Sequence, residues 1–137
     1  MITVVVSAAI FDDQHRILCV KQNYGDDHWA LPGGGVEPGE PPTTALEREV
    51  REESGYRCRI GHLIGVYSAP WKDSLGLLFR ADVAERDDWA PNAEITEVGF
   101  FPSDDLPQPM TTRMQARIRD AFDGQRGVVR TFPTEER

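Results

Sequence analysis

The sequence is poor in three features that would each mark a class of protein: cysteine, basic residues and long apolar runs. It has two cysteines, Cys19 and Cys58, too few for a disulfide framework and without metal-site spacing, so we expect free buried thiols. No apolar run approaches the roughly 20 residues that span a bilayer. The start of the chain alternates like a strand and lacks the basic region and cleavage site of a signal peptide. We therefore expect a cytoplasmic protein that does not act at a membrane.

Basic residues are outnumbered by acidic ones, and the formal net charge is −8. This balance argues against sequence-independent binding of nucleic acid, because such binding depends on Lys and Arg. Carboxylates, in contrast, attract divalent cations, and a bound cation can then attract phosphate groups. The charge therefore excludes nucleic acid as a partner and leaves open a small anionic ligand held through a metal ion.

The composition is that of an ordinary folded domain, with 39% hydrophobic and 28% charged residues, and the 137 residues predict one domain over 1–137. Strands and helices are expected without regular alternation, which favours helices packed on a mixed sheet. The first two strands are expected to form a hairpin. Strands are predicted at 2–11, 16–21, 56–67, 74–84 and 95–101, helices from Thr43 or Thr44 to about Ser54 and over 110–122, and an extended piece within 126–137.

The first helix carries signals at both ends. Glu47 lies three residues after Thr44, a spacing that fits a capping box at the start of the helix. Gly55 is expected to end it, because glycine adopts the left-handed conformation that closes many helices. Gly124 is expected to end the second helix in the same way.

Acidic residues crowd the first helix in an unusual arrangement. At about 100° per residue, Leu46 and Val50 mark the side that faces the sheet, and Glu49 and Glu53 fall on that same side. Glu52 lies at its margin, whereas the arginines of the helix fall on the far side. Buried carboxylates are costly and raise each other's pKa, so a divalent cation is expected among them. The alternative is a solvated acidic face.

Three glycines, Gly33 to Gly35, come shortly before this helix and are expected to open a loop. Because glycine has no Cβ, the backbone of such a loop can approach a ligand closely. Its carbonyls could bind a cation and its amides could meet phosphate oxygens. A plain glycine turn is the alternative interpretation.

The glycines and the helix together resemble the signature motif of the Nudix (MutT-like) hydrolases. The pattern is G-x5-E-x7-R-E-U-x-E-E-x-G-U, where U is a bulky apolar residue. The segments 29–34 and 94–102 also resemble the family's usual lead-in and its later acidic strand, so the resemblance covers nearly the whole chain. The matching residues are Gly34, Glu40, Arg48, Glu49, Val50, Glu52, Glu53, Gly55 and Tyr56.

The resemblance implies an α/β/α sandwich on a mixed sheet and an activity that depends on Mg²⁺ or Mn²⁺. The reaction it implies is hydrolysis of a nucleoside diphosphate linked to another group, X, with release of a nucleoside monophosphate. Glu49, Glu52 and Glu53 would be the metal ligands, helped by the Gly33 carbonyl. Glu53 or Glu49 would also take the proton of the attacking water.

The resemblance implies supporting roles for other residues of the motif. Arg48 would hold a motif glutamate in place, and Glu40 would support the loop and helix beside Gly34, where the substrate's phosphates are expected. Glu97 would be a further metal ligand, with Glu94 as the alternative. Monomer and homodimer both stay open.

Substrate identity is less well defined by the sequence. Pro70 lies about fifteen residues beyond the motif, near the position of a proline in relatives that hydrolyse ADP-ribose, so an ADP-ribose-type nucleotide sugar is one candidate; a (deoxy)nucleoside triphosphate is another. A nucleotide sensor without catalysis and a structural calcium site on an unrelated fold are the alternative functions. Candidate substrate contacts, each of which could equally be ordinary packing or surface charge, are Tyr24, Tyr67 and Trp71 for base stacking and Lys21, Lys72 and Arg16 for phosphates.

Overall fold

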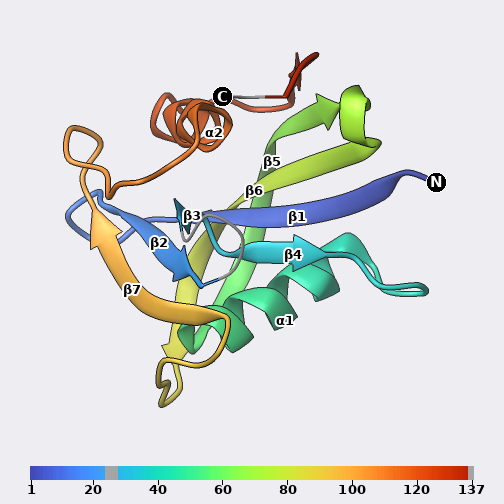
Figure 1. Ribbon diagram of the computed structural model, residues 1–137. Coiled ribbons are helices and arrows are strands. Elements are labelled where there is room, and N and C mark those ends of the chain that lie inside the picture. Colours follow the sequence, from blue (N-terminus) through green and yellow to red (C-terminus); the bar gives the residue numbers. More distant parts are fainter. Residues whose placement is uncertain (24–27, 136–137) are drawn as a thin grey trace.

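Two sheets and two α-helices make up residues 1–23 and 28–135, the part of the chain that the computed structural model describes (Figure 1). The elements, in chain order, are β1 (Thr3–Ile10), β2 (Ile17–Gln22), β3 (Trp29–Ala30), β4 (Gly33–Gly35), α1 (Pro42–Ser54), β5 (Tyr56–Ala69), the 3₁₀ turn η1 (Pro70–Lys72), β6 (Ser74–Arg86), β7 (Ile95–Phe101), α2 (Thr112–Phe122) and β8 (Val128–Thr131). None of the helices in these residues is long and apolar enough to cross a membrane.

The sheets are mixed, as predicted. The larger has the strand order β4-β1-β6-β5-β8, in which β1 is antiparallel to β4 and parallel to β6, and the smaller has the order β3-β2-β7. Figure 1 shows α1 and α2 on opposite sides of the strands. The predicted α/β/α arrangement is therefore confirmed.

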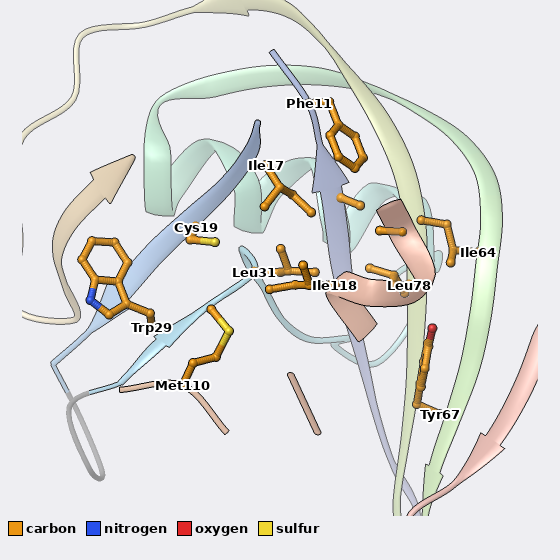
Figure 2. Packing of buried hydrophobic residues seen from close by; sticks show 12 residues of the cluster. Phe11, Ile17, Cys19, Trp29, Leu31, Ile64, Tyr67, Leu78, Met110 and Ile118 are labelled. Carbon is orange, nitrogen blue, oxygen red and sulfur yellow. The ribbon is translucent and has the colours of Figure 1, made fainter. Parts of the chain in front are cut away.

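The side chains of β1 pack into two separate cores, one on each side of the large sheet, because successive side chains of a strand point to opposite faces. Val6 and Ala8 pack with Leu46 and Val50 of α1. Ala9 belongs to the core under α2, which Figure 2 shows from close by. Both helices are thus fixed against the same sheet by buried apolar side chains, each of which contributes roughly 1.5–3 kcal/mol when fully buried.

The predicted hairpin between the first two strands is wrong. β1 and β2 share no ladder; they are joined by one isolated bridge between Phe11 and Ile17. A strand has two edges, and both edges of β1 are taken, one by β4 and the other by β6. β2 therefore pairs with β3 and β7 in the second sheet.

The start of α1 also differs from the prediction. Pro41 is the N-cap, no side chain caps the helix, and Pro42 occupies the first turn, so the capping box of Thr44 and Glu47 is wrong. Proline suits this position because its fixed φ matches the helix and it has no N–H to satisfy. The end of α1 is as predicted, since Gly55 has φ 78° and donates its N–H to the Arg51 carbonyl.

The glycine segment is a strand and not a loop. Gly33, Gly34 and Gly35 form β4 and pair with Ser7, Val6 and Val5 of β1. An added Cβ at Gly33 would lie 2.0 Å from the Val6 carbonyl oxygen, so glycine is required for this close pairing.

The C-terminal elements agree with the prediction in kind. Thr111 caps α2 by accepting the Met114 N–H at 3.1 Å, and the extended piece expected in the tail is β8, which pairs in parallel with β5. Asp120 of α2 is hydrogen-bonded to a residue of β5 and to a residue of β8. It accepts a hydrogen bond from the Tyr67 hydroxyl at 2.8 Å and two from Arg130 at 2.7 Å.

Candidate active site

The carboxylate of Glu53 lies at the contact between α1 and β4. Glu53 is 5% exposed, and one of its carboxylate oxygens accepts a hydrogen bond from the Gly33 N–H at 2.7 Å. In the ladder with β1, Pro32 accepts a hydrogen bond from Ala8 and Val36 donates one to Val4. In an antiparallel pair, the backbone N–H and C=O groups of every second residue point away from the partner strand. The backbone groups of Gly33 are therefore directed toward α1, where Glu53 meets them.

Glu49 and Glu52 follow the helical periodicity as predicted. The side chain of Glu49 is 17% exposed and lies toward the sheet, whereas that of Glu52 is 61% exposed at the margin. An added Cβ at Gly34 would lie 2.5 Å from the Glu49 carboxyl carbon. A glycine at this position therefore leaves the space that the Glu49 carboxylate fills.

Arg48 joins three of the acids of the site, although its Cα lies on the far side of α1. Its guanidinium donates to Glu40 at 2.9 and 3.0 Å and to Glu49 at 2.9 Å, and it lies 3.6 Å from Glu52. The position of Arg48 on the far side of the helix thus does not keep its guanidinium from the acids. Helical angle gives the position of a Cα, whereas the long side chain of arginine reaches around the helix.

The hydrogen bonds of Glu40 make it a support for this arrangement. Besides Arg48, it accepts the Glu37 N–H at 3.1 Å. These contacts hold the turn between β4 and α1 to the helix. Both contacts favour the ionised form, so the pKa of Glu40 is lowered, chiefly by the hydrogen bond from Arg48.

Burial raises the pKa of Glu53 to about 8, and no cationic side chain of residues 1–23 and 28–135 forms an ion pair with it. Desolvation is the main cause; the Gly33 N–H acts in the opposite direction, and the charges of Glu49, Glu94 and Glu52 raise the pKa further. The pKa of Glu49 is also raised by burial, although Arg48 offsets part of the effect. Perturbed carboxylates of this kind gather at functional sites more often than elsewhere.

Of the two later acids, Glu94 is the one whose charge acts on both Glu49 and Glu53. It lies just before β7, in a turn held by the Asn92 side chain, which accepts the backbone N–H groups of Glu94 and Ile95 at 2.9 Å. Glu97, ranked first from the sequence, lies within β7 opposite Lys21 of β2. The charge of Glu94 therefore reaches the carboxylates of α1.

The donor set fits a divalent cation in its chemistry, because carboxylate and carbonyl oxygens are the ligands that Mg²⁺ and Mn²⁺ prefer. Among residues 1–23 and 28–135, no group of three or more His, Cys, Asp or Glu side chains converges as a finished metal site. Arg48 instead compensates Glu49 and Glu52, which leaves the buried Glu53 as the uncompensated charge. A cation beside Glu53 would favour the ionised carboxylate and so offset the desolvation that raises its pKa.

The predicted substrate contacts have different outcomes. Tyr67 is 1% exposed and its hydroxyl is bonded to Asp120, so it is a core residue and its prediction as a stacking platform is wrong. Tyr24 lies outside the described residues. Trp71 is exposed on η1, with Lys72 5.3 Å from the centroid of its ring. Lys21 lies in β2, paired in register with Glu97.

A cavity of about 750 Å³ borders Gly33 and Gly34 on the side of α2. The sequence signalled few of its residues, because those of α2 and the segment before it were read as a core helix. Nδ1 of His28 is buried there without a hydrogen-bond partner among the described residues. The lining includes Lys72, Arg113, Arg117, Met110, Met114 and His28.

Comparisons with known proteins give one consistent family. The family model described as NUDIX domain matches residues 1–122. A MutT-like protein of Streptomyces ambofaciens is 31% identical over 94% of this chain and 82% of its own length. A Bacillus subtilis protein with the provisional name 8-oxo-dGTP diphosphatase is 30% identical over 87% of this chain and 79% of its own length. The crystal structure of a Nudix hydrolase from Nitrosomonas europaea has a TM-score of 0.84 and 24% identity, covering 96% of this chain and 79% of that one.

Proposed function

The chain belongs to the Nudix family of hydrolases, and from this premise we propose that it uses a divalent cation to cleave the diphosphate linkage of a nucleoside diphosphate joined to another group, X. The products would be a nucleoside monophosphate and phosphate-X, or pyrophosphate where the substrate is a triphosphate. The observation that carries the proposal is the Glu53 carboxylate, which is buried against the Gly33 N–H and has no cationic partner in the part of the chain that the structure describes.

The residues present can hold the cation that Nudix hydrolases generally use. Glu49, Glu52 and Glu53, with the Gly33 carbonyl, are the groups that would bind Mg²⁺ or Mn²⁺. The bound ion would neutralise charge on the diphosphate and lower the pKa of water. Glu94 stands near enough to influence both Glu49 and Glu53, which supports it over Glu97 as a further ligand.

The remaining steps fall to side chains of this chain. Arg48 holds Glu49 through a 2.9 Å hydrogen bond, so that this carboxylate keeps its position beside Gly34. Glu53 or Glu49 would accept the proton of the attacking water, since each carboxylate lies beside the glycines where the cation and the diphosphate would bind. Fixed position and charge supply most of the acceleration in phosphoryl chemistry, and these contacts provide both.

Two substrate classes remain candidates. The similarity to the Bacillus subtilis protein favours a deoxynucleoside triphosphate, including an oxidised one. An ADP-ribose-type nucleotide sugar is supported by Pro70, which begins η1 beside the cavity-lining Lys72. The 750 Å³ cavity has room for a nucleoside or a sugar in either case.

A panel of both classes with and without Mg²⁺, read by the mass of the products, tests the proposal. We expect release of a nucleoside monophosphate that requires the metal. Glu53→Gln is the impaired variant, and Glu47→Gln, exposed on the same helix, is the matched control. Tight nucleotide binding without products would favour the alternative, a Nudix-fold sensor. If no member of the panel is bound or hydrolysed, the proposal is contradicted.

A further inference from the structure

Cationic side chains gather on one side of the cavity, apart from the acids of α1. Lys72 comes from η1, and Arg113 and Arg117 come from α2. The concentration is notable in a chain of net charge −8. It lies on the α2 face of the large sheet, whereas Glu49 and Glu53 lie on the α1 side.

Charge on Lys72 and Arg117 is poorly compensated. Neither forms an ion pair with a carboxylate in residues 1–23 and 28–135. Burial and the charge of Arg113 lower the pKa of both; the charge of Arg117 also lowers that of Lys72, and the charge of Glu135 acts on Lys72 in the opposite direction. An anion entering the cavity would relieve this repulsion.

Arg117 stacks on aromatic rings, and no acid of the described residues forms an ion pair with it. Its guanidinium lies 5.1 Å from the ring centroid of Tyr67 and 5.5 Å from that of Phe132. Stacking leaves the edge of a guanidinium able to donate two parallel hydrogen bonds, the geometry that matches phosphate. Gly76 is its neighbour on β6, since an added Cβ there would lie in van der Waals contact, 3.4 Å from Nη2 of Arg117.

Strand register separates this cationic group from the diphosphate site. Gly35 of β4 and Gly76 of β6 are both opposite Val5 of β1. Neighbouring strands are about 4.8 Å apart, so Gly76 is roughly 10 Å from β4. Adjacent phosphates of a polyphosphate share an oxygen and lie closer together than one strand spacing. A phosphate held by Arg117 beside Gly76 therefore need not be one of the two phosphates beside Gly33.

We propose that Lys72 and Arg117, with Arg113 beside them, bind a phosphate monoester that the substrate carries apart from its scissile diphosphate. This deepens the proposed function and rests on it. The monoester could stand on the 2′ or 3′ oxygen of the nucleoside ribose or on the group X. The substrate class is thus a nucleoside diphosphate derivative with an additional phosphate, and a neutral sugar in the cavity would be a poorer ligand.

Calorimetric binding of product pairs that differ by one phosphate tests this without requiring turnover. To test for a phosphate on the nucleoside ribose, adenosine 2′,5′-bisphosphate and adenosine 3′,5′-bisphosphate are each compared with adenosine 5′-monophosphate. To test for a phosphate on X, ribose 1,5-bisphosphate is compared with ribose 5-phosphate. We expect one pair to show about tenfold tighter binding of the member with the extra phosphate, equivalent to ~1.4 kcal/mol.

Charge-removing variants assign the preference to the cavity. Lys72→Gln and Arg117→Gln should lose most of this preference, measured within each variant as the ratio of the two affinities of a pair. Arg119→Gln is the matched control, because it removes one positive charge from an exposed position of the same helix. Lys72 is exposed on η1, so its variant keeps the test valid if Arg117→Gln fails to fold.

The outcomes separate this inference from the proposed function. No preference in any pair, or an equal loss in Arg119→Gln, overturns the monoester site even if the enzyme hydrolyses a nucleotide of the panel. A preference that depends on Lys72 and Arg117 supports the monoester site even if no hydrolysis is found, in which case the proposed function alone fails.

Discussion

Two buried carboxylates in this molecule have opposite surroundings. Asp120 is 3% exposed and accepts hydrogen bonds from the Tyr67 hydroxyl and from two nitrogens of Arg130, so its pKa is lowered, chiefly by Arg130. Glu53 is 5% exposed and accepts the Gly33 N–H, and burial raises its pKa to about 8. The two carboxylates are thus buried to a similar extent, but hydrogen bonds compensate the negative charge of Asp120 fully and that of Glu53 incompletely.

The difference distinguishes a carboxylate that supports the fold from one kept for chemistry. Asp120 links α2, β5 and β8, and each of its bonds favours the charged form. Glu53 costs stability when ionised, and a residue that breaks a local rule in this way is expected at a functional site. The predictions below challenge this division, beginning with the largest effect.

Catalysis should depend on Glu53 and not on Asp120. Glu53→Gln preserves the shape of the side chain and removes its charge, and we expect kcat to fall by about 10³-fold. Asp120→Asn should leave the turnover of folded protein within about threefold. Steady-state kinetics on the best substrate of the panel, with the folded fraction measured by circular dichroism, gives both values. Equal losses in the two variants would erase the distinction between the two carboxylates.

Stability should respond to the same substitutions in the opposite sense. Asp120→Asn removes a buried hydrogen-bonded charge and should lower the free energy of unfolding by about 2 kcal/mol. Glu53→Gln should raise it in metal-free buffer at pH 8, because it removes a buried ionised group. Chemical denaturation of both variants and of wild type provides the measurement, and a destabilised Glu53→Gln at this pH would be inconsistent with the raised pKa.

The pH dependence follows from the direction of each pKa shift. Folding raises the pKa of Glu53 from 4.5 to about 8, so the native state retains a proton that the unfolded state releases, and stability falls as the pH rises through that window. Folding lowers the pKa of Asp120 below 3.8, so its contribution is present above that value and is lost as the pH falls through the lowered pKa. Glu53→Gln should abolish the fall in stability toward high pH, and Asp120→Asn should abolish the loss of stability toward low pH.

Positioning of Glu49 by Arg48 should have a smaller effect. Arg48→Gln removes the 2.9 Å hydrogen bonds to Glu40 and Glu49, and loss of a group that orients a metal ligand lowers activity by about 10- to 100-fold. Arg51→Gln is the matched control, because Arg51 bonds to Asp87 on the exposed side of α1. Comparable kinetics for the two arginine variants would show that Arg48 has no special role.

The smallest expected effect separates Glu94 from Glu97. Glu94→Gln should reduce kcat/KM by about tenfold, since its charge acts on Glu49 and Glu53, whereas Glu97→Gln should change it by less than about twofold. Mn²⁺ titration of activity measures metal affinity in both variants. A larger loss in Glu97→Gln would restore the assignment made from the sequence.

The features that the sequence predicts correctly are those with a fixed period. Helical angle places Glu49 and Glu53 toward the sheet without knowledge of any neighbour, and both are found there. Gly55 is correctly assigned as the end of α1 because a left-handed residue is required at that point. The resemblance to the Nudix motif supplied the layered fold, which periodicity alone does not specify.

Two of the errors concern partners that lie elsewhere in the sequence. Whether β1 pairs with β2 depends on β4 and β6, and the reach of Arg48 depends on where Glu40 ends up. Each of these is decided by tertiary contacts that no local pattern contains.

Thermal unfolding of wild type and Glu53→Gln at pH 8, each with and without saturating Mg²⁺, tests most directly whether Glu53 is kept for a cation. Binding to the native state alone stabilises a protein by about 2.7 kcal/mol at a hundredfold excess over Kd. The account predicts a metal-free melting temperature lower for wild type than for Glu53→Gln, and a marked rise on adding Mg²⁺ for wild type only. A rise of equal size in both proteins, or none in wild type, would contradict it.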